Sequence, residues 1–187
     1  VKRLSDGRLV GWGRTRGTML LAAPPEILRA QSMDDATIRV WDVNAGGGAL
    51  ELRGHTATVN GVLECPDELG LISWSDDGSL RMWNLETGRC IGISSQHSAE
   101  ILGAQWLANG DLLSWAANGQ LSFQGIPFGE AGHTNANHTA AVRGVAFIRN
   151  ERVVTWADDR TIRTWSAQNG KPIRVMTGHR YLVEGVE

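Results

Sequence analysis

Short stretches in which apolar and polar residues alternate, each closed by a glycine-containing turn, fill most of the chain. The clearest example is residues 57–94, where ATVNGVLEC, GLISWS, SLRMWN and RCIGIS are separated by tight breaks. Alternation with a period of two predicts β-strands, and breaks rich in glycine and aspartate predict turns. The third strand carries large side chains on both faces, as expected of a sheet packed between two other sheets. The pattern predicts an all-β protein built from four-stranded antiparallel units.

This unit recurs with a period of about 41 residues. The series are His55, His97, His138 and His179; Trp74, Trp115 and Trp156; Trp41, Trp83 and Trp165, with Phe123 filling the gap; and an apolar-x-Gly-apolar pattern at 59–62, 101–104, 142–145 and 183–186. Four independent series with one period indicate a repeat protein.

The segments SWSDDGS (73–79), Gly54-His55, RMWN (81–84) and their copies resemble the WD40 repeat family, and the likeness extends over residues 32–187. The close sequence likeness of the repeats to one another is similar to that in the highly repetitive propellers of bacteria. The resemblance implies a WD40-type β-propeller of about four to five four-stranded blades, with the first strand of each blade nearest the central channel.

The resemblance also implies one hydrogen-bonded chain per blade, from a histidine through a hydroxyl residue and an aspartate to a tryptophan. Carried over by position, the members are His55, Ser73, Asp77 and Trp83; His138, Thr155, Asp159 and Trp165; His97 and Ser114, with Asn118 and Phe123 at the last two places; and Asp35 and Trp41 in the first blade. Phenylalanine has no donor, so the blade with Asn118 is predicted to be the loosest.

We expect one domain, residues 1–187. The predicted repeats are 1–18, a hairpin that completes a closing blade; 19–54; 55–96; 97–137; 138–178; and 179–187, the first strand of that closing blade. Residues 19–31 are predicted to supply the first two strands of the first blade, because 20–35 align with 62–77 without a gap. The alternative is that they are an irregular relic of a repeat.

Four to five blades are few for a ring of this family, although propellers range from about four to eight blades. An open arc would expose an apolar blade face and a strand edge at each end. Two chains meeting head to tail would bury both, so we expect a homodimer that exchanges strands at the chain ends. The alternative is that the chain is a fragment of a longer protein.

Composition narrows the function classes further. The chain has 187 residues, of which 42% are hydrophobic, and a net charge of −2. This balance argues against a nucleic-acid or membrane partner. The chain has no long apolar run and its first residues do not resemble a signal peptide, so we expect a cytoplasmic protein.

Histidine, serine and aspartate together are also the residues of a hydrolase triad. Here they recur once per blade, and an enzyme does not need several copies, so we expect a structural role, no catalysis, no cofactor and no metal site.

The expected function is a protein–protein interaction scaffold, with the partner not identified. The candidate partner-binding residues lie at the turns that a propeller presents on one face: Asp34, Thr58, Asn60, Asp76, Arg143, Asp158, Arg180 and Tyr181. The alternative is a carbohydrate- or small-ligand-binding, lectin-like propeller that uses its tryptophans.

Overall fold

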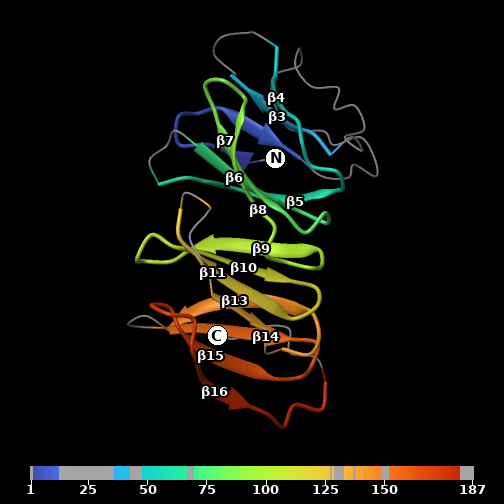
Figure 1. The fold of residues 1–187 in the computed structure, drawn as a ribbon, viewed down its shortest axis with the longest axis vertical. Coiled ribbons are helices and arrows are strands. Elements are labelled where there is room, and N and C mark those ends of the chain that lie inside the picture. Colours follow the sequence, from blue (N-terminus) through green and yellow to red (C-terminus); the bar gives the residue numbers. More distant parts are fainter. Residues whose placement is uncertain are drawn as a thin grey trace.

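The computed structural model is all-β in the residues it describes, with four sheets stacked one after another (Figure 1). The described residues are 2–12, 36–42, 48–66, 70–126, 128, 133–136, 138–148 and 152–181. Within these ranges there is no helix, and therefore no helix long and apolar enough to cross a membrane.

Each sheet has four antiparallel strands in chain order, and we call the sheets blades 1 to 4. Blade 1 contains β1 (Lys2–Arg3), β2 (Leu9–Gly11), β3 (Ile38–Trp41) and β4 (Leu50–Leu52); blade 2 contains β5 (Val59–Glu64), β6 (Gly70–Ser75), β7 (Leu80–Asn84) and β8 (Cys90–Ser94). Blade 3 contains β9 (Ile101–Trp106), β10 (Leu112–Ala116), β11 (Gln120–Gln124) and β12 (His133–Ala136); blade 4 contains β13 (Val142–Ile148), β14 (Arg152–Ala157), β15 (Ile162–Ser166) and β16 (Pro172–Met176). The predicted four-stranded antiparallel units are therefore confirmed.

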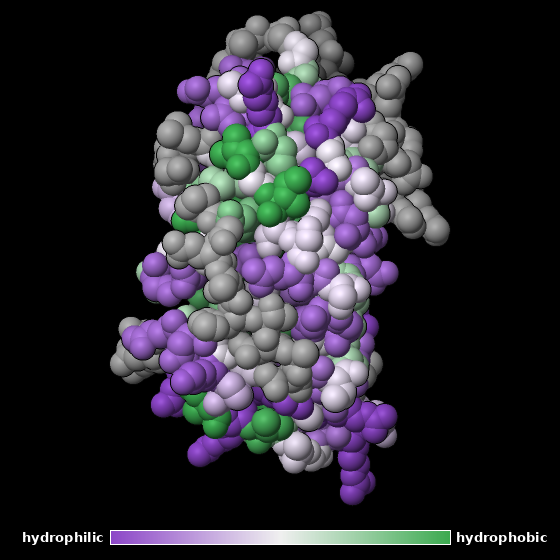
Figure 2. All heavy atoms as spheres, viewed as in Figure 1, coloured by the Kyte–Doolittle hydropathy of each residue, from purple (hydrophilic) through white to green (hydrophobic). Residues whose placement is uncertain are grey.

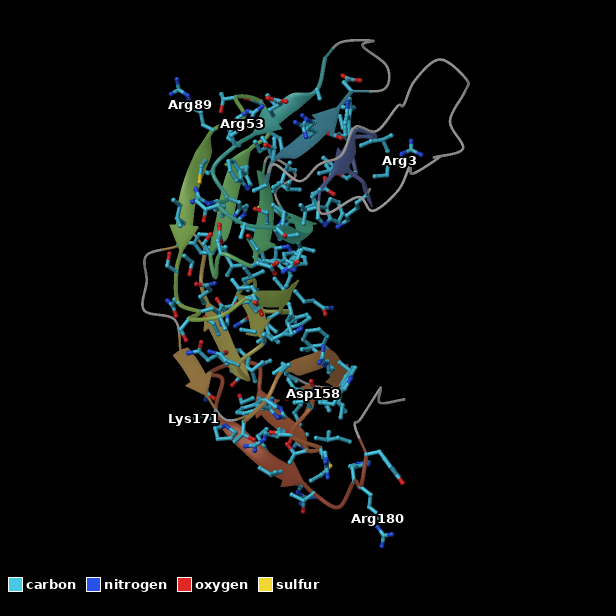
Figure 3. The ribbon with its side chains drawn as sticks, turned by 90° about the vertical axis from the view of Figure 1, so that its right-hand side faces the viewer. Arg3, Arg53, Arg89, Asp158, Lys171 and Arg180 are labelled. Carbon is cyan, nitrogen blue, oxygen red and sulfur yellow. The ribbon has the colours of Figure 1, made fainter. Side chains whose placement is uncertain are left out.

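The blades follow a curved path, with blade 1 and blade 4 at opposite ends of the stack (Figures 1 and 3). Strand β9 contacts both β5 and β13, so the first strands of successive blades lie side by side. This is the arrangement of strands in a β-propeller, in which blades are placed around a central axis.

The N-terminal hairpin belongs to blade 1, which corrects the sequence-based prediction of a closing blade. Strand β2 pairs with β3, with Leu9 opposite Trp41 and Val10 opposite Val40. The hairpin is held there by burial, because Leu4 and Val10 are 3% and 0% exposed. The places predicted for residues 19–31 are thus taken by β1 and β2, and residues 19–31 themselves lie outside the described part of the chain.

Three hydrophobic clusters hold neighbouring blades together. One cluster joins blades 1 and 2, another joins blades 2 and 3, and another joins blades 3 and 4. Each blade uses alternate residues of its strands for its two faces: Leu71 and Trp83 of blade 2 face blade 1, whereas Ile72 and Leu80 face blade 3. Stability of such a stack comes from these nearest-neighbour interfaces.

The repeated glycine of the first strand has a steric role. A Cβ atom on Gly61, Gly103 or Gly144 would lie 2.1–2.2 Å from the indole of the tryptophan opposite it on the second strand. The indole of Trp74, Trp115 or Trp156 therefore lies directly on the glycine backbone. The glycine and tryptophan series seen in the sequence are two halves of one contact.

Candidate functional site

The predicted hydrogen-bonded chain is present in blade 2. Trp83 Nε1 donates to Ser73 Oγ at 2.8 Å, and Ser73 Oγ lies 2.7 Å from His55 Nε2. His55 Nδ1 lies 2.8 Å from Asp77 Oδ2. Tryptophan can only donate and ionised aspartate can only accept, so each proton points toward the aspartate and His55 is neutral with its proton on Nδ1.

Blade 4 repeats the same geometry with threonine in place of serine. Trp165 Nε1 donates to Thr155 Oγ1 at 2.9 Å, and Thr155 Oγ1 lies 2.7 Å from His138 Nε2. His138 Nδ1 lies 2.9 Å from Asp159 Oδ2. Since only a hydroxyl oxygen is needed at the centre, serine and threonine are interchangeable there.

The surroundings of the chain keep the histidines neutral and the aspartates ionised. Burial lowers the pKa of His55 and of His138, and this outweighs the opposite effect of the paired aspartate. Burial alone would raise the pKa of Asp77, but hydrogen bonds from Ser79, Thr56 and His55 outweigh burial and hold this pKa at about 2. Asp159 is held at a pKa of about 2 in the same way.

These residues do not form a hydrolytic site. The Ser73 side chain is 0% exposed, and its oxygen already accepts the Trp83 N–H, so no substrate carbonyl can reach it. The same set recurs in blade 4, as a structural role requires. Among the described residues no group of three or more metal-ligating side chains comes together.

Blade 3 has an incomplete chain, and the structure corrects one member of it. His97 Nε2 lies 2.7 Å from Ser114 Oγ, but the buried His97 Nδ1 has no partner because Asn118 stands in place of the aspartate. Gln124, not Phe123, occupies the tryptophan position, since Gln124 lies opposite Leu112 as Trp83 lies opposite Leu71. The Gln124 amide nitrogen is also buried without a partner.

Restoring the aspartate of blade 3 is expected to stabilise the protein. Asn118→Asp supplies an acceptor for His97 Nδ1, and satisfying that buried group should raise the free energy of unfolding by about 1 kcal/mol. Urea unfolding near neutral pH measures the change. The control is the same substitution in a His97→Gln background, where the gain should vanish. An equal effect in both backgrounds would show that the two side chains do not interact.

The pH dependence of the free energy of unfolding should reveal the lowered pKa of the buried His97. Burial lowers its pKa to about 4, against 6.5 in the unfolded chain, so below pH 6.5 the unfolded chain binds a proton that the folded protein does not. The free energy of unfolding should therefore fall as the pH decreases from about 6.5 to 4, by up to about 1.4 kcal/mol per pH unit for this proton. His97→Gln should reduce the slope in urea titrations; an unchanged slope would contradict the assignment.

Blade 1 lacks the hydroxyl residue that stands at the centre of the hydrogen-bonded chain in the other blades. Its residue at the hydroxyl position is Gly11, which lies two residues beyond Leu9, the residue opposite Trp41, and offers no side-chain oxygen to Trp41. Asp35, predicted to belong to this blade's chain, lies outside the described residues. Of the two members predicted for blade 1, Trp41 is therefore the one that lies among the described residues.

The candidate partner-binding face is formed by the turns between second and third strands and by the first strands. In blade 2, Asn60 Nδ2 donates to Asp76 Oδ1 at 2.6 Å, and the Asp76 N–H donates to Thr58 O. In blade 4, Arg143 Nε donates to Asp158 Oδ1 at 2.8 Å, and the Arg143 hydrogen bonds lower the pKa of Asp158. The structure therefore joins these predicted residues into two polar pairs.

Blade 3 places an apolar pair between them, which the sequence analysis missed. Leu102 and Ala117 occupy the positions of Asn60 and Asp76, and the Ala117 N–H donates to Glu100 O in the same turn geometry. Both side chains are partly exposed. The 41-residue period carries the signal for them, since Leu102 and Ala117 lie 42 and 41 residues after Asn60 and Asp76.

The remaining predicted face residues do not converge with these pairs. Arg180 extends into solvent away from Asp158 (Figure 3). Tyr181 is 84% exposed, and Asp34 lies outside the described residues. The face supported by contacts is thus the row Asn60–Asp76, Leu102–Ala117 and Arg143–Asp158, which we call the turn row.

Comparison with known proteins agrees with this geometry. Residues 49–84 match the family model of the WD domain, G-beta repeat, a span that includes the whole hydrogen-bonded chain of blade 2. The nuclear distribution protein PAC1 of Yarrowia lipolytica is 42% identical over 76 residues, which cover 40% of this chain and 17% of that protein. The DENN domain and WD repeat-containing protein SCD1 of Arabidopsis thaliana is 37% identical over 83 residues, 41% of this chain and 7% of that protein.

Solved structures show the same fold. The computationally designed Ika8 protein superposes with a TM-score of 0.68 at 27% identity, covering 81% of this chain and 46% of the designed one. The RRP9 WD40 repeats superpose with a TM-score of 0.61 at 23% identity, covering 70% of this chain and 42% of theirs. The fold is a WD40-type β-propeller arrangement of four-stranded blades. The part of the chain that matches PAC1 or SCD1 spans less than a fifth of the length of either relative. The relatives are eukaryotic, so the expected bacterial repeat type gains no support.

Proposed function

We propose that this chain is a non-catalytic protein–protein interaction scaffold that binds a protein partner through the turn row. The observation that carries the proposal is the partly exposed Leu102–Ala117 step between two polar pairs. A protein-binding surface typically has an apolar centre and a polar rim. WD repeat proteins such as PAC1 are the sequence relatives, which supports a binding role over catalysis.

The turn row is rigid, which favours binding. Asn60 Nδ2 also donates to Ile101 O at 3.0 Å and so links blade 2 to blade 3 beneath the row. The backbone bond between the turn and the preceding first strand recurs in all three blades, with donors Asp76, Ala117 and Asp158. Because the surface is already ordered, little conformational entropy is lost when a partner docks.

A capture experiment with matched variants tests the scaffold. Proteins retained by the parent chain are compared with those retained by Leu102→Asp and by Ile91→Asp, a control at an exposed apolar side chain of β8. We expect a discrete partner whose capture falls at least tenfold with Leu102→Asp and is unchanged with Ile91→Asp. A set of retained proteins that is the same for all three chains would contradict the proposal.

The lectin-like alternative has less support. Trp83 and Trp165 are 0% exposed, and the Nε1 groups of Trp74 and Trp156 are buried. Packing within and between blades accounts for these rings, so they are not free to stack on a sugar. The cytoplasmic location stays a prediction.

We further propose that the scaffold is a homo-oligomer whose ring is completed by a second copy. The support is the curved path that the four described blades follow, as blades do in a ring (Figures 1 and 3). The expected exchange of strands at the chain ends loses its basis, because the hairpin of residues 2–11 already completes blade 1. Residues 182–187, the other half of that exchange, lie outside the described part.

A further inference from the structure

The junction between blades 2 and 3 is polar at a place where the junction between blades 1 and 2 is apolar. Leu52 of blade 1 and Trp83 of blade 2 belong to one hydrophobic cluster. The residues at the same repeated positions one blade further on are Ser94 of blade 2 and Gln124 of blade 3. Ser94 Oγ donates to Gln124 Oε1 at 2.7 Å, so a hydrogen bond across the junction replaces an apolar contact.

A second pair of positions in this junction changes in the same direction. In blade 2, Arg81 lies against Gly54, where a Cβ atom would be 2.7 Å from Arg81 Nη1. In blade 3, Ser122 stands in place of the arginine and Gln96 in place of the glycine. Ser122 Oγ donates to Gln96 Oε1 at 3.3 Å. Since the short serine leaves room for the glutamine, the two replacements belong together.

The polar side chains of this junction lie inside the protein, with Ser122 at 0%, Gln124 at 3% and Ser94 at 6% exposure. Strand β8 buries Ser94 although its Ile91 and Ile93 are 56% and 52% exposed. Green, apolar side chains also reach the surface in the upper half of the face shown in Figure 2. Because a buried polar group is costly unless it is hydrogen-bonded, this inverted burial calls for a partner at every polar atom of the junction.

One polar atom of the junction has no partner within the protein. The Gln124 amide oxygen accepts the bond from Ser94, and the Gln124 amide nitrogen is buried without a hydrogen bond. Turning the amide by half a rotation exchanges its oxygen and nitrogen, and the oxygen would then be the atom without a partner. Either orientation therefore leaves one buried amide atom to be satisfied.

The hydroxyl residue of blade 3 lacks a bond that its counterparts make. In blades 2 and 4, the hydroxyl oxygen accepts a tryptophan N–H and also bonds a histidine. Ser114 Oγ of blade 3 bonds His97 Nε2 at 2.7 Å, and the residue at the tryptophan position is Gln124. Gln124 and Ser114 lie on the same face of neighbouring strands, diagonally across the pair. An unpaired amide atom and a hydroxyl with spare bonding capacity thus lie where the other blades have an indole.

We infer that the junction of blades 2 and 3 contains a binding site for one ordered water molecule that joins Gln124 to Ser114. The water accepts a hydrogen bond from Gln124 Nε2 and donates one to Ser114 Oγ, as the indole N–H does in blades 2 and 4. Ser114 in turn donates to His97 Nε2, so the hydrogen-bonded chain of blade 3 is continued by solvent. Ser122 Oγ, directly opposite Ser114 in the sheet, is the third partner, and buried waters typically make about three hydrogen bonds.

The chemistry around the site suits water rather than an ion. The three groups that face it are two serine hydroxyls and one amide, all neutral, and a buried ion would need a charged partner. Water both donates and accepts, so it satisfies the Gln124 amide in either orientation. This site lies within the junction, away from the turn row, and does not depend on the proposed scaffold function.

Nuclear magnetic resonance of the full chain tests the site without any substitution. The side-chain amide hydrogens of Gln124 should show Overhauser contacts to a long-lived water. The indole N–H hydrogens of Trp83 and Trp165 already donate to protein hydroxyls, so they should show none and serve as internal controls. A crystal structure should show solvent density within hydrogen-bond distance of both Gln124 and Ser114. A Gln124 amide without a water contact, or one bonded directly to Ser114, would overturn the inference.

A double variant tests which residues hold the water. Gln124→Trp combined with Ser94→Leu restores the residues of the junction between blades 1 and 2, and the new indole should donate to Ser114 and displace the water. Gln105→Ala, at an exposed side chain of β9, is the matched control and should leave the water contact of Gln124 unchanged. Solvent density that persists at Ser114 in the double variant would overturn the assignment. If the double variant does not fold, the measurement on the parent chain still decides the question.

Discussion

Replacing Trp83 with alanine should lower the free energy of unfolding by about 3–5 kcal/mol, the usual cost of truncating a fully buried tryptophan. Trp83 is 0% exposed and fills the interface between blades 1 and 2. The substitution removes that packing and also the N–H that Ser73 accepts at 2.8 Å. Urea unfolding followed by circular dichroism is the appropriate measurement, because the fluorescence itself depends on tryptophan.

A second variant separates packing from hydrogen bonding. Trp83→Phe keeps most of the apolar ring but loses the donor, so the cost should be only about 1 kcal/mol. Ser73 still donates to His55, and the bond from His55 to Asp77 is retained. If the phenylalanine variant were as unstable as the alanine variant, the polar chain rather than packing would dominate. If alanine cost less than about 1 kcal/mol, this interface would not stabilise the fold.

The sequence predicted the blades well because each blade is built from local contacts. Neighbouring strands are joined by short turns, and the histidine, hydroxyl and aspartate positions of blades 2 and 4 lie within one repeat. The resemblance to the WD40 family, carried over at the repeated positions, therefore predicted His55 near Asp77 and His138 near Asp159, as the structure has them.

The two errors have physical causes. In blade 3, the prediction places the aromatic Phe123 at the tryptophan position, one residue too early. In a strand a shift of one residue moves a side chain to the other face, so Phe123 packs toward blade 4 while Gln124 occupies the polar chain. The spacing of six residues from Asn118 to Gln124, equal to that from Asp77 to Trp83, carried the correct register.

In blade 1 the error concerned which strands pair. Residues 20–35 resemble a strand pair in sequence. However, β3 pairs with β2, and more than 20 residues separate these two strands in the sequence. Such pairing depends on which side chains are buried between blades, and Leu4 and Val10 of the hairpin fill that space. An alignment of one repeat with another does not show which segment of the chain will fill the space between two blades.

Replacing Gly103 with alanine should be about as costly as the upper end of the range for overpacked cores, about 3 kcal/mol. A Cβ atom there would lie 2.1 Å from the indole of Trp115. The indole is rigid and lies between blades 3 and 4, so neither it nor the paired first strand can shift cheaply. The matched control is Gly125→Ala in the same blade, where the nearest atom is Asp111 Oδ1 at 3.7 Å and the cost should be below about 0.5 kcal/mol.

The double variant distinguishes a steric clash from a general weakness of the strand. In a Trp115→Leu background the indole is absent, so Gly103→Ala should lose most of its cost, with a coupling energy of about 2 kcal/mol between the two sites. Thermal or urea unfolding of the four chains measures this coupling. Additive costs would mean that the glycine is needed for its backbone rather than for the tryptophan above it. Strong coupling would establish the glycine–tryptophan contact as the reason both series share one period, since neither residue then tolerates change without the other.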